Sequence, residues 1–164
     1  MMVTWVRGHF KNVPGSLEFD ENRPERMKVD VTIKADSLWT GEPNRDRHLR
    51  SADFFDVEHY PNIEFHSNAV KVIGERDYAV TGDLTIRGVT KPVMLNVAYL
   101  GQWDTPWWVD GVNKGPKRRA GFLATTRINR HDFGVSWNDV VPNSGVVVGD
   151  YIDITLDAEA VKAD

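Results

Sequence analysis

The chain has 164 residues and contains no cysteine. Without thiols it can form no disulfide, no thiolate nucleophile, no thiolate zinc site and no iron–sulfur cluster. The same absence leaves the redox compartment open, because a protein without thiols is indifferent to the redox potential around it.

An excess of basic charge is also missing. The 20 Lys and Arg residues stand against 24 Asp and Glu residues, which gives a net charge of −4. Nucleic-acid-binding proteins usually carry a basic face, so we expect no nucleic-acid partner.

No apolar run is long enough to cross a membrane as a helix. The longest uncharged stretch, residues 140–149, covers about ten residues, against roughly 20 for a spanning helix. The apolar start is interrupted by Arg7 and His9 and has no basic leader, so no signal peptide is predicted. We expect the chain as given to be cytoplasmic, and to be exported only if a further segment precedes Met1.

What the sequence does contain is hydrophobicity with a period of two. Apolar residues make up 41% of the chain, enough for the core of a single domain over residues 1–164. Tyr78, Val80, Leu84 and Ile86 alternate with polar or small residues, as in a half-buried antiparallel strand. The pattern predicts an all-β antiparallel barrel or sandwich, with strands at residues 4–10, 16–19, 28–35, 62–72, 77–86, 92–100, 119–129 and 146–161.

Two segments interrupt this alternation. Pro43 begins a short predicted helix over residues 43–49, and Ser51 is placed to cap a further turn that contains Phe54 and Phe55. Residues 103–119 are rich in Gly, Pro, Trp and Lys and are predicted to form a long loop.

Several local strings resemble one family. They are NRDRHLRSADFFDV (residues 44–57) followed by Tyr60-Pro61, TGDLTIRGVTKPV (81–93), AGF (120–122), INR (128–130), DFGVSWN (132–138) and VGD (148–150) before a last strand that ends in Glu159-Ala160. In this order they resemble the YceI-like family over nearly the whole chain. The resemblance implies a lipocalin-like antiparallel barrel of about eight strands, with one or two short helices, closed around an apolar cavity. It also implies a long isoprenoid ligand, such as a polyprenyl compound or a quinone tail, or a related amphiphile.

The sequence departs from the family pattern in two places. The family's first strand, with its Asp…His-Ser pattern, is absent before residues 1–10. We expect either a start truncated upstream or a neighbouring chain that fills the seam, as in a homodimer, because an open sheet edge invites aggregation. The second departure is the segment 103–119, which is longer than the usual family connection.

Inward-facing apolar positions are the predicted ligand contacts. For each of them the alternative is an ordinary core residue, since alternation says which side chains point inward and not which touch a ligand. The predicted positions are Trp5, Phe19, Val31, Ile33, Phe65, Leu84, Ile86, Leu95, Val97, Phe122, Ala124 and Ile154.

A second group of residues is predicted at the barrel ends. Phe54, Phe55, Phe133 and Trp137 are expected to plug the ends. His48 and Arg45 are candidates to meet a ligand head group at the mouth, with a solvated helix surface as the alternative interpretation. The five histidines share no metal-ligand spacing, so we expect no metal site and no cofactor.

The tryptophan-rich segment suggests a membrane contact. Trp107 and Trp108 come with several basic residues; tryptophan favours lipid–water boundaries, and basic side chains attract anionic head groups. The alternative is that the tryptophans fold back over the barrel rim.

Three functions follow as hypotheses. The leading one is non-catalytic sequestration or transport of an isoprenoid lipid in the barrel. The first alternative is an isomerase or cyclase on the same scaffold, with Tyr78, Tyr99, Tyr151 or a histidine as acid or base. The second is a protein-interaction module whose core is filled by its own side chains.

Overall fold

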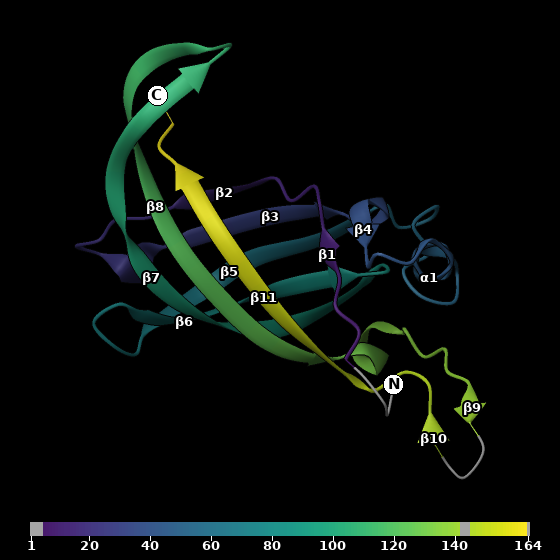
Figure 1. Cartoon of the computed structure of the whole chain (residues 1–164). Coiled ribbons are helices and arrows are strands. Elements are labelled where there is room, and N and C mark those ends of the chain that lie inside the picture. Colours follow the sequence, from purple (N-terminus) through teal and green to yellow (C-terminus); the bar gives the residue numbers. More distant parts are fainter. Residues whose placement is uncertain (1–4, 142–144, 164) are drawn as a thin grey trace.

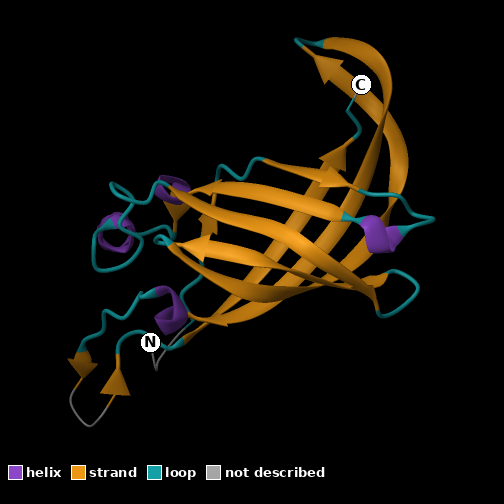
Figure 2. Cartoon of the chain, turned by 180° about the vertical axis from the view of Figure 1, so that it is seen from behind, coloured by secondary structure: helices purple, strands orange, loops and turns teal. Residues whose placement is uncertain are grey.

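Antiparallel β-structure dominates the computed structural model, which describes residues 5–141 and 145–163. Figures 1 and 2 show a curved sheet with short helices at its ends. The helical elements are η1 (Pro24–Arg26), η2 (Ala35–Ser37), α1 (Pro43–Arg50) and η3 (Arg130–Phe133). The strands are β1 (His9–Phe10), β2 (Gly15–Glu18), β3 (Lys28–Lys34), β4 (Leu38–Trp39), β5 (Asn62–Val72), β6 (Asp77–Ile86), β7 (Val89–Val109), β8 (Val112–Asn129), β9 (Val140–Val141), β10 (Gly145–Val146) and β11 (Tyr151–Val161).

Seven strands form one sheet in the part of the chain that the structure describes. Their order is β11-β8-β7-β6-β5-β3-β2, and every neighbouring pair is antiparallel. The sheet is strongly curved (Figure 1). The antiparallel all-β prediction is therefore confirmed, with seven strands in the sheet where about eight were expected. Among the described residues β2 and β11 are its two edges.

The predicted loop at residues 103–119 is wrong, because this segment is a long β-hairpin. β7 and β8 continue past the other strands as a two-stranded ribbon, which curves away from the sheet in both views (Figures 1 and 2). Pro106 lies opposite Pro116. Proline has no backbone N–H, but in a two-stranded ribbon each strand is an edge strand, where proline is tolerated because no third strand needs that donor. Asp110 and Gly111 at the tip have φ values of 50° and 77°, the pattern of a type I′ hairpin turn.

The two ends of the chain also differ from the prediction. β1 is shorter than the strand predicted at 4–10, and it pairs with β4 outside the large sheet; residue 4 lies outside the described residues. The strand predicted at 146–161 is two strands, because Val146 pairs with Val140 in β9 whereas β11 begins at Tyr151.

The core lies on the inner face of the sheet. Cross-strand register aligns its side chains in rows, one of which contains Tyr78, Val97, Ala124 and Leu156 from four adjacent strands. Such rows bury one face of each strand and leave the alternate residues to solvent. No helix in residues 5–141 and 145–163 is long and apolar enough to span a membrane.

Candidate functional site

The inner face carries most of the predicted ligand contacts. Phe65, Leu84, Ile86, Leu95, Val97, Phe122 and Ala124 are buried there, and Phe19, Val31, Ile33 and Ile154 are half-buried against the same cluster. The prediction that Trp5 faces inward is wrong, because its side chain is 75% exposed and the residue belongs to no strand. Alternation placed it on a first strand that the structure confines to residues 9 and 10.

Burial on the inner face decreases from the middle of the sheet toward its two edges. Val80 of β6 and Val97 of β7 are buried, whereas Val31 of β3 and Ile154 of β11 keep partial solvent access. β3 and β11 lie next to or at the two sheet edges, which do not pair with each other within the described residues. The apolar inner surface is therefore least covered beside these two unpaired edges, which we call the open side.

Aromatic rings fill one end of the inner face. The Phe19 ring lies 4.9 Å from that of Tyr99 and 5.1 Å from that of Phe122, centroid to centroid. Tyr99 is 3% exposed, and no hydrogen-bond partner for its hydroxyl occurs among the described residues. Burial raises the pKa of Tyr99, so the hydroxyl stays protonated at neutral pH. The sequence indicates Tyr99 only as a possible acid or base, because the lack of a hydrogen-bond partner for its hydroxyl follows from packing and not from any local pattern.

The four aromatic residues predicted to plug the barrel ends lie in or just after α1 and η3, at the opposite end of the sheet. Trp137 lies 4.6 Å from the His48 ring and 5.4 Å from the Phe54 ring, and Phe133 is almost fully buried. Phe55 packs edge-on against the Phe10 ring of β1, with the two ring centroids 5.8 Å apart. His48 Nε2 lies 2.9 Å from Asp53 Oδ2, so its polar edge already has a partner within the chain.

Arg45, the second head-group candidate, contacts the protein's own backbone. Its guanidinium donates to the Thr40 hydroxyl at 2.8 Å and to the Thr40 carbonyl at 3.1 Å. Thr40 in turn donates from its amide and its hydroxyl to the buried Asp46 carboxylate, and the hydroxyl bond lowers the pKa of Asp46. These contacts fix α1 next to β4. They favour the structural interpretation of this cluster over a head-group site.

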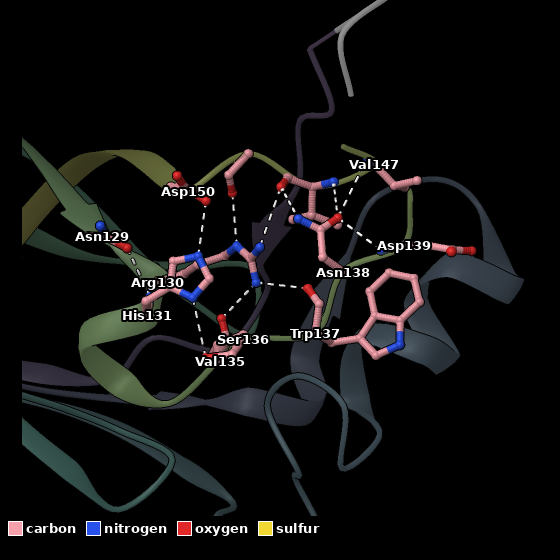
Figure 3. A network of polar contacts seen from close by, with 12 residues as sticks. Asn129, Arg130, His131, Val135, Ser136, Trp137, Asn138, Asp139, Val147 and Asp150 are labelled. Carbon is pink, nitrogen blue, oxygen red and sulfur yellow. Dashed lines mark hydrogen bonds and ion pairs between the residues drawn. The ribbon is translucent and has the colours of Figure 1, made fainter. Parts of the chain in front are cut away.

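Arg130 organises the segment that follows β8. Its buried guanidinium donates to the carbonyls of Gly149 at 2.9 Å, Val135 at 2.7 Å and Trp137 at 2.9 Å (Figure 3). Burial lowers its pKa. A guanidinium presents five donors in a fixed fork, which suits several carbonyls of one loop. Sequence reasoning noticed the surrounding motif and did not assign Arg130 a role.

His131 joins the same segment at the surface. Its Nε2 lies 3.0 Å from Asp150 Oδ1 and its Nδ1 lies 3.3 Å from Ser136 Oγ (Figure 3). All three residues are exposed. The arrangement connects η3 to the residue before β11.

Within residues 5–141 and 145–163, no three His, Asp or Glu side chains gather into a group that could hold a metal ion. A concavity of about 580 Å³ is lined by Met94, Arg127 and Tyr151, among others. These residues alternate with inner-face residues along their strands, so this concavity is on the outside of the sheet.

Comparison with known proteins gives consistent matches. The YceI-like domain model matches residues 1–160. A UPF0312 protein of Pseudomonas putida (strain W619) is 38% identical over 159 residues, which cover 97% of this chain and 75% of that protein.

Solved structures match at the level of the whole fold. The Campylobacter jejuni YceI protein superposes with a TM-score of 0.81 and 29% identity, over all of this chain and 89% of that one. BcnA of Burkholderia cenocepacia superposes with a TM-score of 0.78 and 25% identity, over 97% of this chain and 90% of that one.

Proposed function

This chain belongs to the YceI-like family, and from that premise we propose that it binds a long isoprenoid lipid or similar amphiphile along its inner face, without catalysis. The proposed ligand is a polyprenyl or quinone tail, which the protein sequesters or transports. The structural similarity to BcnA of Burkholderia cenocepacia supports the same fold for this chain.

One observation carries this proposal: the apolar inner face is only half-buried where β3 and β11 approach the open side. Val31 and Ile154 face inward yet keep solvent access. Exposed apolar surface of this kind is unfavourable in water and is typical of ligand-binding grooves. A linear hydrocarbon would cover it without needing a precisely placed polar residue.

The expected affinity is compatible with a carrier. Large ligands gain at most about 0.3 kcal/mol per heavy atom. A forty-carbon tail could therefore gain up to about 12 kcal/mol by that ceiling.

Tyr99 is the proposed hydrogen-bond donor to the head group of the ligand. Leaving a buried hydroxyl without a partner costs roughly 1–3 kcal/mol. A carbonyl or ether oxygen of a ligand head would accept its hydrogen bond once the neighbouring rings move to admit it. We therefore expect the head group near Tyr99, Phe19 and Phe122, and not at His48 and Arg45, whose polar atoms have partners in the chain.

The function is tested by native mass spectrometry and organic extraction of the purified protein, followed by uptake of a long-chain ubiquinone and a polyprenol. The proposal expects a co-purifying lipid or stoichiometric uptake. Ile154→Asp should abolish uptake because it places a carboxylate on the inner face, whereas Thr155→Asp, on the outer face of the same strand, should not. A clean apo mass without uptake would favour the interaction module, and conversion of the added compound would favour the enzyme.

The head-group position is tested with Tyr99→Phe and Tyr78→Phe, a matched pair of buried inner-face tyrosines. Losing one hydrogen bond corresponds to a roughly tenfold change in affinity. Tyr99→Phe should weaken ubiquinone binding by that factor and leave a headless hydrocarbon of equal length unaffected. Equal losses for both ligands, or in both variants, would contradict the placement.

A further inference from the structure

The ribbon, residues 103–119, reaches beyond the rest of the sheet. β11 pairs with β8 as far as Val161 and Arg119, and the backbone N–H of Lys162 donates to the Arg118 carbonyl. Beyond that point β7 and β8 pair only with each other. Figures 1 and 2 show that the ribbon projects from the sheet at one end of the molecule, and that α1 lies at the other end.

Its large apolar side chains are exposed toward the tip. Trp108 is 62% exposed, Val112 is 54% exposed, and Trp103 and Val109 are also exposed. The alternative from the sequence, tryptophans folded back over the barrel rim, does not fit these exposures. Only Trp107 is partly covered, with the Lys117 ammonium and the Arg119 guanidinium each 5.3 Å from its ring.

The charge of the ribbon is opposite to that of the whole chain. It contains Lys114, Lys117, Arg118 and Arg119 against Asp104 and Asp110, a net charge of +2 in a chain whose net charge is −4. Arg118 pairs with Asp104 and Arg119 with Glu159 of β11. Lys114 lies near the tip, and the only acid on the turn is Asp110.

We infer that the ribbon tip docks onto an anionic lipid surface, with Trp108, Val109 and Val112 at the head-group boundary and Lys114 and Lys117 attracted to the lipid phosphates. Tryptophan rings favour this boundary, and basic residues near an anionic leaflet add affinity that salt screens. The type I′ turn between Val109 and Val112 presents these side chains together at the tip. The inference does not depend on what the inner face holds.

The experiment uses the absence of native cysteine. Val112→Cys at the tip and Val140→Cys in β9, an exposed valine at the opposite end, are each labelled with an environment-sensitive fluorophore. The proteins are mixed with vesicles of pure phosphatidylcholine, or with 30% phosphatidylglycerol added (about a third anionic lipid), at low and high salt. We expect a blue shift at Val112 with anionic vesicles only, lost at high salt, and no shift at Val140.

Variants then separate the two contributions. Trp108→Ser should weaken co-flotation with anionic vesicles at least tenfold, and Lys114→Glu with Lys117→Glu should weaken it on the order of tenfold. Trp39→Ser, an exposed tryptophan outside the ribbon, is the control and should change nothing. Circular dichroism confirms that each variant folds.

Three results would overturn the inference. They are no binding to anionic vesicles, equal responses at Val112 and Val140, or a shift at Val112 that rises with protein concentration without vesicles. The last would identify a second copy of the chain as the occupant.

Discussion

Two segments at opposite ends of the sheet are held in different ways. The closing segment, residues 130–150, of which 142–144 lie outside the described part, is fixed by the buried Arg130 guanidinium through backbone carbonyls. The ribbon is held by exposed contacts such as Arg118 with Asp104. Buried charge-assisted bonds leave costly unpaired groups when broken, whereas exposed pairs contribute little. We therefore assign the closing segment to stability and the ribbon to binding.

The largest expected effect comes from Arg130→Met. The substitution removes the donor from the buried Val135 carbonyl and from the part-buried carbonyls of Trp137 and Gly149, and we expect the free energy of unfolding to fall by about 3 kcal/mol. Urea denaturation measures this. Arg118→Met in the ribbon is the matched control and should leave the free energy of unfolding nearly unchanged. Similar losses in both variants would remove the distinction between the two segments.

A smaller effect is expected at two left-handed glycines, Gly134 after η3 and Gly111 at the ribbon tip. Their φ values are 72° and 77°, and an added Cβ would meet no atom within 4 Å at either one. Alanine therefore costs only backbone strain in the left-handed region, about 1 kcal/mol. Gly134→Ala should lower the global free energy of unfolding by that amount.

Gly111→Ala should act locally, because a two-stranded ribbon is marginally stable by itself and can open without the sheet. Hydrogen exchange should become faster in residues 103–119 and remain unchanged elsewhere. Faster exchange throughout β8 and β11 would show instead that the ribbon unfolds together with the sheet.

The smallest effect is a difference in pH dependence between Asp46 and Asp104. A hydrogen bond from Thr40 lowers the pKa of Asp46 from its ordinary value, and one from Arg118 does the same for Asp104. A lowered folded-state pKa gives stability that is present above the unfolded value and is lost as the pH falls through the folded value.

Asp46→Asn should therefore lower Tm at pH 7 and have less effect near pH 3. Asp104→Asn should follow the same trend with a smaller change, because its side chain is half exposed. A thermal melt series from pH 7 to pH 3 measures both. A Tm difference between Asp46→Asn and the parent that stays constant over this range would contradict the assignment.

The strands of the sheet were predictable because alternation and turn residues are local signals. Residues 77–86 were predicted at the bounds that β6 has. The ribbon was missed because its glycines, prolines and tryptophans were taken together as a loop. The Asp110-Gly111 pair between Val109 and Val112 was the available signal, since Asp-Gly between apolar residues is a strong hairpin indicator.

The candidate site was only partly predictable. Inward positions such as Leu84 and Val97 follow from periodicity, and they lie on the inner face. The contacts of Arg130 join positions up to 19 residues apart along an irregular segment, so no periodic pattern reports them. The unpartnered Tyr99 hydroxyl depends on which groups three-dimensional packing brings near it, and the exposure of Trp5 depends on pairing that the sequence alone does not specify.

The most direct test of ligand binding on the inner face is photo-crosslinking with a polyprenyl probe that carries a diazirine along its chain. Residue-level mass spectrometry then locates the adducts, with unlabelled ubiquinone as competitor. The account predicts competed adducts at inner positions such as Val31 and Ile154. Adducts confined to Met94, Arg127 and Tyr151 on the outside of the sheet would contradict it.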